Sequence, residues 1–429
     1  MQKFKLLPIT VAVAASLASL SSFAAETDLA ALEQRILELE SQVGDIKYVD
    51  DQQQAVLTAE TNVPDGIVFS GYARYGAHYK SGDERYVDIG TTGRSVGRLG
   101  NEANGGEVQL AKLFQADNGA IWDIVFMADH WEADSWADDG GLSMKKMYAG
   151  VTNVFESQPE LYMWAGRDFH QRPQQGLNDY FWMSHDGQGA GFNNLDFGGA
   201  KLDMGFVGQV KGGLVNDNGR YAITSKLHSI NAGIGQLDLY ANYGFASDEA
   251  DSDVAGDPKV SDETAYLVGA TLGLGESNKL VVKYGDGADS SVFELKGDYQ
   301  TFYASLEGSY AASEQFIIDY LVSYKDNSGS DLDRENTEYA GIVRPQYQWN
   351  DVHSTWLEAG YGMVDYDDDG EENAWKVTLS QNVSLGGLPW SRPMLRFYTT
   401  VGDVETKGNT VKTTNVDTLS FGAMFEAWW

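Results

Sequence analysis

Residues 67–79 read IVFSGYARYGAHY, and their apolar side chains recur at every second position. One parity holds Ile67, Phe69, Ala73, Tyr75, Ala77 and Tyr79, and the other holds Ser70, Tyr72, Arg74, Gly76 and His78. Successive side chains of a β-strand point to opposite faces of the sheet. The stretch therefore predicts a strand with one apolar face and one wet face.

The end of the chain repeats this alternation. Leu419, Phe421, Ala423, Phe425, Ala427 and Trp429 share one parity, and Thr418, Ser420, Gly422, Met424, Glu426 and Trp428 share the other. A soluble β-sandwich buries its apolar faces with the same period, so the pattern alone does not decide whether that face meets a protein core or a lipid.

The lengths of the connections help to decide. Short links at 117–119, 312–314 and 350–352 separate strand-like runs, and long acidic links are expected at 248–263, 326–338, 365–372 and 403–417. Tight turns on one rim and long loops on the other are typical of outer-membrane barrels. At about 20 residues per strand and connection, residues 66–429 predict an all-β antiparallel barrel of roughly 16 to 18 strands.

The N-terminal residues predict export from the cytoplasm. Residues 1–24 have Lys3 and Lys5, an apolar stretch from Leu6 to Leu20, and small residues up to Ala24, as in a secretory signal peptide. Later residues hold no apolar run of the length that a membrane helix needs. An exported chain without such a helix is either soluble or a closed barrel, because only a barrel then satisfies its backbone groups in lipid.

Residues 25–46 predict a periplasmic coiled coil, followed by a linker at 47–65. The apolar residues of this segment recur at alternating intervals of three and four: Leu29, Leu32, Ile36, Leu39, Val43 and Ile46. About two and a half heptads are too few for a stable isolated coil, so we expect it to form only where several copies are held close. The alternative is an amphipathic helix packed on a domain.

Composition excludes several classes of function. The chain has no Cys, which removes disulfides, thiolate metal sites and a cysteine nucleophile. Its net charge of -33, or -35 without Lys3 and Lys5, argues against a nucleic-acid partner. Asp365, Asp367, Asp369 and Gly370 mimic the start of an EF-hand, but the twelfth position is Lys376, so we expect a solvated loop and no metal. Without a phosphate-binding loop or a nucleophile elbow, we expect neither a cofactor nor an enzyme.

The wet faces carry aromatic residues beside charged ones, as a sugar channel would need. Sugars pack their flat C–H faces on aromatic rings, and their hydroxyl groups need donors and acceptors nearby. Tyr72 shares its face with Arg74, Trp428 with Glu426, and Trp390 with Arg392 and Arg396. Trp131 begins a polar segment, where an exposed Trp suggests contact with a solute or a neighbouring subunit.

Short motifs along nearly the whole chain after residue 66 resemble maltoporins. They occur in the family's order: residues 71–74 (GYAR), 98–102 (RLGNE), 164–167 (WAGR), 171–172 (QR), 187–191 (GQGAG), 390–393 (WSRP) and 426–429 (EAWW). The resemblance implies a homotrimeric barrel of 18 strands in outer-membrane lipid and lipopolysaccharide, with a third loop folded inward. It also implies facilitated diffusion of maltose and maltodextrins along an aromatic slide and a polar track.

The resemblance also assigns the site residues. The slide would use Trp131, reaching in from a neighbouring subunit, together with Tyr72, Trp428 and Trp390. Phe181 would be the constriction aromatic, and the polar track would use the following residues: Arg74, Arg98, Glu107, Lys145, Arg172 and Asp179.

The sequence departs from the maltoporin pattern at several slide positions. Gly105 or Gly106 stands where the family carries a slide Tyr, Val268 where it carries the innermost slide Phe, and Ser184 where it carries an Asp. The family's first-loop Cys pair is absent. The heptads at 29–46 resemble the extension of sucrose porins, so another sugar such as sucrose remains an alternative, as does a general diffusion porin.

Overall fold

The computed structural model describes residues 63–82, 86–132, 141–210, 217–251, 259–275, 277–408 and 414–429. The expected signal peptide, coiled coil and most of the linker lie outside these residues.

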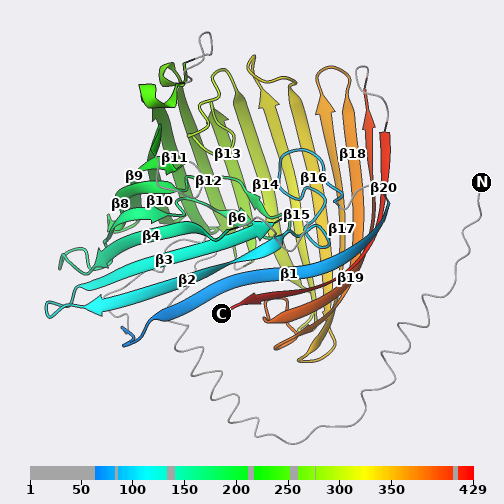
Figure 1. Cartoon of the computed structure of the whole chain (residues 1–429), viewed down its shortest axis with the longest axis horizontal. Coiled ribbons are helices and arrows are strands. Elements are labelled where there is room, and N and C mark those ends of the chain that lie inside the picture. The colour runs from blue at the N-terminus through cyan, green and yellow to red at the C-terminus, as the bar shows by residue number, and fades with distance from the viewer. Residues whose placement is uncertain are drawn as a thin grey trace, which may run out of the picture. The chain divides into compact units, whose positions relative to one another are not determined.

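Within this part of the chain, an antiparallel sheet of 18 strands closes on itself, because β1 pairs with both β2 and β20 (Figure 1). The barrel strands are β1 (Val68–Gly82), β2 (Asn104–Gln115), β3 (Ile121–Glu132), β4 (Ser143–Thr152), β5 (Tyr162–Asp168), β8 (Gly187–Asp196), β9 (Lys201–Val210), β10 (Asp217–Asn231), β11 (Gln236–Ala246), β12 (Thr264–Leu274), β13 (Asn278–Asp286), β14 (Gln300–Ala311), β15 (Phe316–Ser328), β16 (Asn336–Gln348), β17 (His353–Tyr366), β18 (Glu371–Ser384), β19 (Met394–Lys407) and β20 (Thr414–Trp428). The strands β6 (Gln174–Gln175) and β7 (Tyr180–Phe181) pair separately, and η1 (Asp248–Ala250) and η2 (Val260–Asp262) are 3₁₀ turns. The expected all-β barrel is confirmed.

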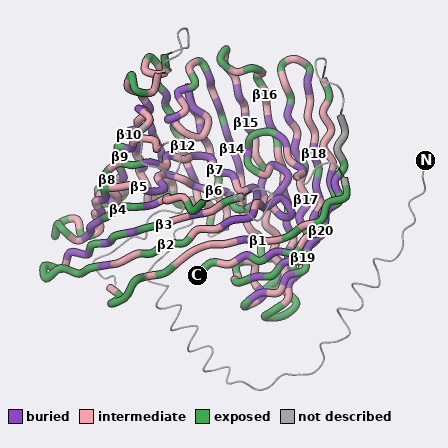
Figure 2. Tube along the Cα trace, viewed as in Figure 1, coloured by how far each residue is buried: buried purple, intermediate pink, exposed green. Residues whose placement is uncertain are grey.

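Buried and exposed residues alternate along the barrel strands (Figure 2), and the apolar ones are on the exposed side, the reverse of a soluble protein. On β20, Leu419, Phe421 and Phe425 are exposed on the outer surface, whereas Ser420 and Glu426 are buried on the inner face. Similarly, Leu395 and Phe397 of β19 point outward, opposite the buried Arg396. Among the described residues, no helix has the length and apolar character needed to cross a bilayer. Because apolar side chains form the outer surface and charged ones line the interior, the surrounding solvent is hydrocarbon.

The two rims of the barrel differ in their connections. One rim carries turns such as 232–235 and 349–352, and we call it the short-turn rim. At the opposite rim, several expected loops are shorter than the sequence indicated, because β15 runs to residue 328, β16 begins at 336, and only 367–370 join β17 to β18. Strands that extend beyond the bilayer meet water on both faces, so they lose the alternation that would mark them in the sequence.

Three connections fold into the barrel: residues 86–103, residues 169–186 (the constriction segment) and residues 287–299. Backbone hydrogen bonds join the constriction segment to the other two connections. Arg94 N–H of the first donates to the Asn178 carbonyl at 2.5 Å, and Ser184 N–H donates to the Ser290 carbonyl of the third at 2.9 Å. The constriction segment is the connection from β5 to β8, so the inward third loop that the resemblance implied is present.

These inward segments pack against the inner face of the barrel wall. Trp182 of the constriction segment is fully buried in a hydrophobic cluster with Leu267 of β12 and Tyr303 of β14. In the 86–103 segment, Leu99 N–H donates to Glu358 of β17 at 2.8 Å, and Lys376 of β18 donates to the Leu99 carbonyl. The inward segments therefore line the lumen along β12, β14, β17 and β18.

Candidate functional site

The inner wall carries an aromatic strip formed by Trp131 of β3, Tyr72 of β1 and Trp428 of β20. The rings of Tyr72 and Trp131 stack with centroids 6.0 Å apart and planes inclined by 24°. Tyr72 is directly opposite Trp428 in the β1–β20 register. Trp131 and Trp428 keep 38% and 45% of their surface exposed, so their rings are accessible from the lumen.

A pair of arginines and one aspartate border the strip on the side of the constriction segment. Asp179 forms ion pairs with Arg74 at 2.8 Å and with Arg98 at 3.2 Å. Burial by itself would raise the pKa of Asp179, but the two guanidinium groups outweigh burial and leave that pKa below its ordinary value. The carboxylate therefore stays charged and holds both arginines in place, and the Arg74 guanidinium carbon lies 5.2 Å from the ring centre of Trp131.

Glu426 continues this network along the strip, because Arg98 also lies 3.4 Å from its carboxylate. Its carboxylate accepts hydrogen bonds from the Tyr72 hydroxyl at 2.8 Å, from Arg392 at 2.5 Å and from Arg396 at 3.0 Å. The guanidinium carbon of Arg392 also lies 4.2 Å from the ring centre of Trp428. The strip is thus bordered by charged groups that are held in place by their own partners.

The constriction segment contributes a second cluster. Arg172 lies between two rings, with its guanidinium carbon 4.2 Å from the centre of Phe169 and 4.1 Å from the centre of Phe181, and it pairs with Asp186 at 3.4 Å. Stacking between rings presents the edge of the guanidinium and its N–H donors to a solute.

The remaining polar-track residues lie on neighbouring strands. Glu107 of β2 lies opposite Tyr72 where β2 pairs with β1, and opposite Asp129 where β2 pairs with β3. Lys145 of β4 pairs with Asp129 at 3.4 Å. These charges continue the polar border from the strip toward β4.

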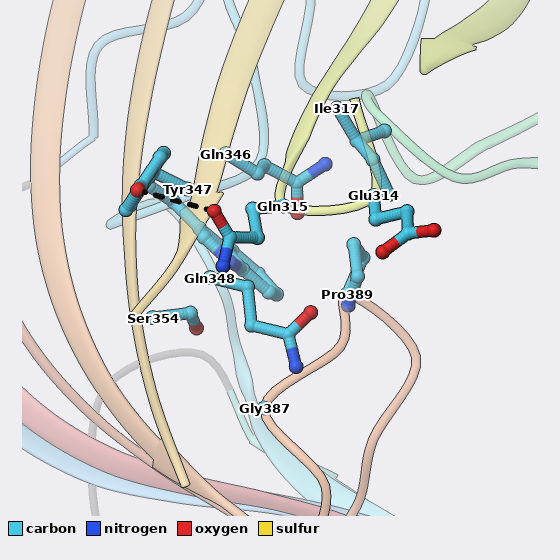
Figure 3. Close-up of a pocket in the computed structure, with 10 residues that line it drawn as sticks. Glu314, Gln315, Ile317, Gln346, Tyr347, Gln348, Ser354, Gly387 and Pro389 are labelled. Atoms are coloured by element: carbon cyan, nitrogen blue, oxygen red, sulfur yellow. Dashed lines mark hydrogen bonds between the residues drawn. The ribbon is translucent and has the colours of Figure 1, made fainter. Parts of the chain in front are cut away.

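Trp390 stands apart from these clusters. It lies in the turn between β18 and β19 rather than in a strand, and 60% of its surface is exposed. A pocket at this short-turn rim is lined by the following residues: Glu314, Gln315, Ile317, Gln346, Tyr347, Gln348, Ser354, Trp356, Gly387 and Pro389 (Figure 3). It contains none of the candidate site residues, so we do not assign the site to it.

A family model of the LamB porins matches residues 67–429, which is the whole barrel. The chain belongs to the LamB porin family. Membership makes this protein an outer-membrane channel for sugars or other solutes, and not an enzyme.

Solved structures with a similar chain trace are also outer-membrane barrels. OccD3 of Pseudomonas aeruginosa is 12% identical with a TM-score of 0.49, and the match covers 90% of this chain and 98% of that one. Wzi of Escherichia coli, titled a carbohydrate-binding β-barrel, is 11% identical with a TM-score of 0.45 over 92% of this chain and 88% of that one. An anion-selective porin from Comamonas acidovorans is 12% identical with a TM-score of 0.40, over 85% and 99%. No conclusion about this LamB porin follows from them, because these TM-scores are below 0.5.

One slide position differs from what the sequence indicated. Val268, the counterpart of the innermost slide Phe, points out of the barrel and is 43% exposed, and Leu267 occupies the inner face, fully buried beside Trp182. Even Leu267 is covered by the inward segments, so β12 offers no slide residue to a solute in this LamB porin.

Sequence reasoning also missed several members of the site. Asp129 lies on the same parity as the inward Val125, so alternation could have found it. Phe169 and Asp186 belong to the constriction segment, which has no regular alternation of apolar and polar residues. Only the folded structure therefore shows that they contact Arg172.

Proposed function

We propose that this protein is a sugar-selective channel for facilitated diffusion of maltose and maltodextrins, working as a homotrimer. The observation that carries this proposal is the strip of Trp131, Tyr72 and Trp428 beside a network of charged groups. A general diffusion porin needs charges at its constriction but has no use for a continuous aromatic surface.

The strip matches both surfaces of a sugar chain. The rings offer a flat apolar surface to the C–H faces, and Arg98 and Arg172, whose side chains stay partly exposed, would donate to the hydroxyl groups. Each stacked ring would contribute about 1 to 3 kcal/mol and each hydrogen bond ~1 kcal/mol. Shallow sites in a row allow a sugar to move onward, so the concentration gradient alone can drive transport.

The proposal is tested by sugar block of single-channel current in planar bilayers. Maltohexaose should interrupt the current at lower concentrations than sucrose. Stronger block by sucrose would favour the alternative of a sucrose-type porin, and absence of block by either sugar would favour a general diffusion porin.

Variants identify the residues involved. Trp131→Ala and Arg172→Ala should each weaken maltohexaose block several-fold and leave open-channel conductance nearly unchanged, because each removes one contact of the solute path. Trp375→Ala is the matched control, since Trp375 is exposed on the outer face of β18. Unchanged block in the first two variants would remove Trp131 and Arg172 from the path.

A further inference from the structure

We propose that Trp131 completes the aromatic strip of its own barrel, in the space that Gly105 leaves on the strand between Trp131 and Tyr72. This inference rests on the proposed function and specifies which subunit provides the outermost ring. The resemblance to maltoporins instead implied a ring from a neighbouring subunit.

The alternation of β3 points Trp131 into its own lumen. The side chains that share its parity, Val125, Met127 and Asp129, are buried inside the barrel. The opposite parity, which includes Trp122 and Phe126, is exposed on the outer surface. Because Trp131 belongs to the inward set, its ring does not need to cross a subunit boundary to reach the channel.

The strand register then aligns Trp131 with the rest of the strip. Gly105 of β2 is directly opposite Trp131 on one side and directly opposite Arg74 of β1 on the other. These three residues therefore form one row across three strands. The contacts agree with the register, since the Trp131 ring stacks on Tyr72 and lies beside the Arg74 guanidinium of the same chain.

The absence of a side chain at Gly105 allows the Trp131 ring to extend across β2 to Tyr72. A Cβ atom at position 105 would lie 2.4 Å from Cε3 of Trp131 and 2.6 Å from the carbonyl oxygen of His130. Any side chain there would occupy the space through which the Trp131 ring crosses β2. The aromatic ring that position 105 of β2 lacks is thus replaced by the ring of Trp131 from β3. Each protomer then carries a complete strip.

Photo-crosslinking with isotope-labelled chains tests the placement. Tyr72→p-benzoylphenylalanine keeps an aromatic ring at position 72 and captures nearby side chains on illumination. Chains grown on ¹⁴N and on ¹⁵N are mixed unfolded, refolded together, illuminated and digested. We expect the peptide with position 72 to be joined to the peptide with Trp131 in pairs of the same isotope.

Two results would overturn the placement: joined peptides of mixed isotope, or the absence of any product that contains Trp131. The same photo-reactive residue at Tyr75, which faces outward, is the control and should not capture Trp131. A separate measurement tests the role in sugar contact: Trp131→Tyr should keep most of the maltohexaose block that Trp131→Ala loses. Equal block in both variants and the unmodified protein, together with same-isotope pairs, would overturn the sugar-contact role and leave the placement intact.

Discussion

Glu426 has an unusual position for a charged residue, because it is 2% exposed and still surrounded by ionic partners. Its guanidinium partners are Arg98 of the 86–103 segment, Arg392 of the β18–β19 turn and Arg396 of β19. The Tyr72 hydroxyl also donates to it. Taking so many charges out of water is costly unless every partner is present. The network is therefore a structural support for the aromatic strip as well as its polar border.

At the scale of this residue, we expect Glu426→Gln to destabilise the barrel by about 3 to 5 kcal/mol, because removing one partner leaves buried guanidinium groups uncompensated. Urea unfolding in lipid vesicles, followed by Trp fluorescence, would measure the change. Glu405→Gln is the control, since Glu405 pairs with Lys407 at an exposed site of β19. A loss for Glu426→Gln no larger than that of the control would show that the buried network does not support the fold.

The outer face of a single strand, β18, can show whether the barrel is surrounded by hydrocarbon. On β18, Leu379 faces outward and its neighbours Thr378 and Ser380 are fully buried inside. Gln381 lies on the same outer face, two residues nearer the short-turn rim. If the outer face meets hydrocarbon, the cost of a charge on it depends on depth.

We expect Leu379→Arg to lower the free energy of unfolding by about 2 to 4 kcal/mol, and Gln381→Arg by about 0 to 1 kcal/mol, because the second site lies nearer the interface. Both values would come from the same vesicle unfolding assay. Equal, small effects at the two positions would contradict a hydrocarbon belt at Leu379.

Assembly into an oligomer involves the whole molecule, including the segment before the barrel. The barrel closes through the pairing of β1 with β20. The heptads at 29–46 precede β1 in the chain. Their proposed role is to join the periplasmic ends of several barrels, where high local concentration compensates for the short coil.

Deletion of residues 25–46 should leave single-channel conductance unchanged and lower the temperature at which the oligomer dissociates. Semi-native electrophoresis after heating would follow dissociation, and bilayer recording would follow conductance. An unchanged dissociation temperature would favour the alternative of an amphipathic helix that does not join subunits.

The sequence alone predicted the strands, because successive side chains of an extended chain point to opposite faces. Where one face meets lipid and the other meets water, apolar and polar residues alternate. This alternation predicted the barrel and the inward faces of Tyr72, Arg74 and Trp428, and the spaced motifs predicted the family. Alternation is not informative where the chain leaves the barrel wall. The ends of the long loops were accordingly misjudged, whereas Val268 was matched to a slide position by the resemblance and faces outward on β12.

Folding alone brought together the residues on either side of the channel. Asp179 meets Arg74 and Arg98 only because the constriction segment and the 86–103 segment pack inside the same barrel, and Glu426 joins them across the closure of β1 with β20. Likewise, Trp131 reaches Tyr72 because the register places Gly105 between them. Such neighbours are distant in the chain and meet through packing and register, which no local pattern of residues encodes.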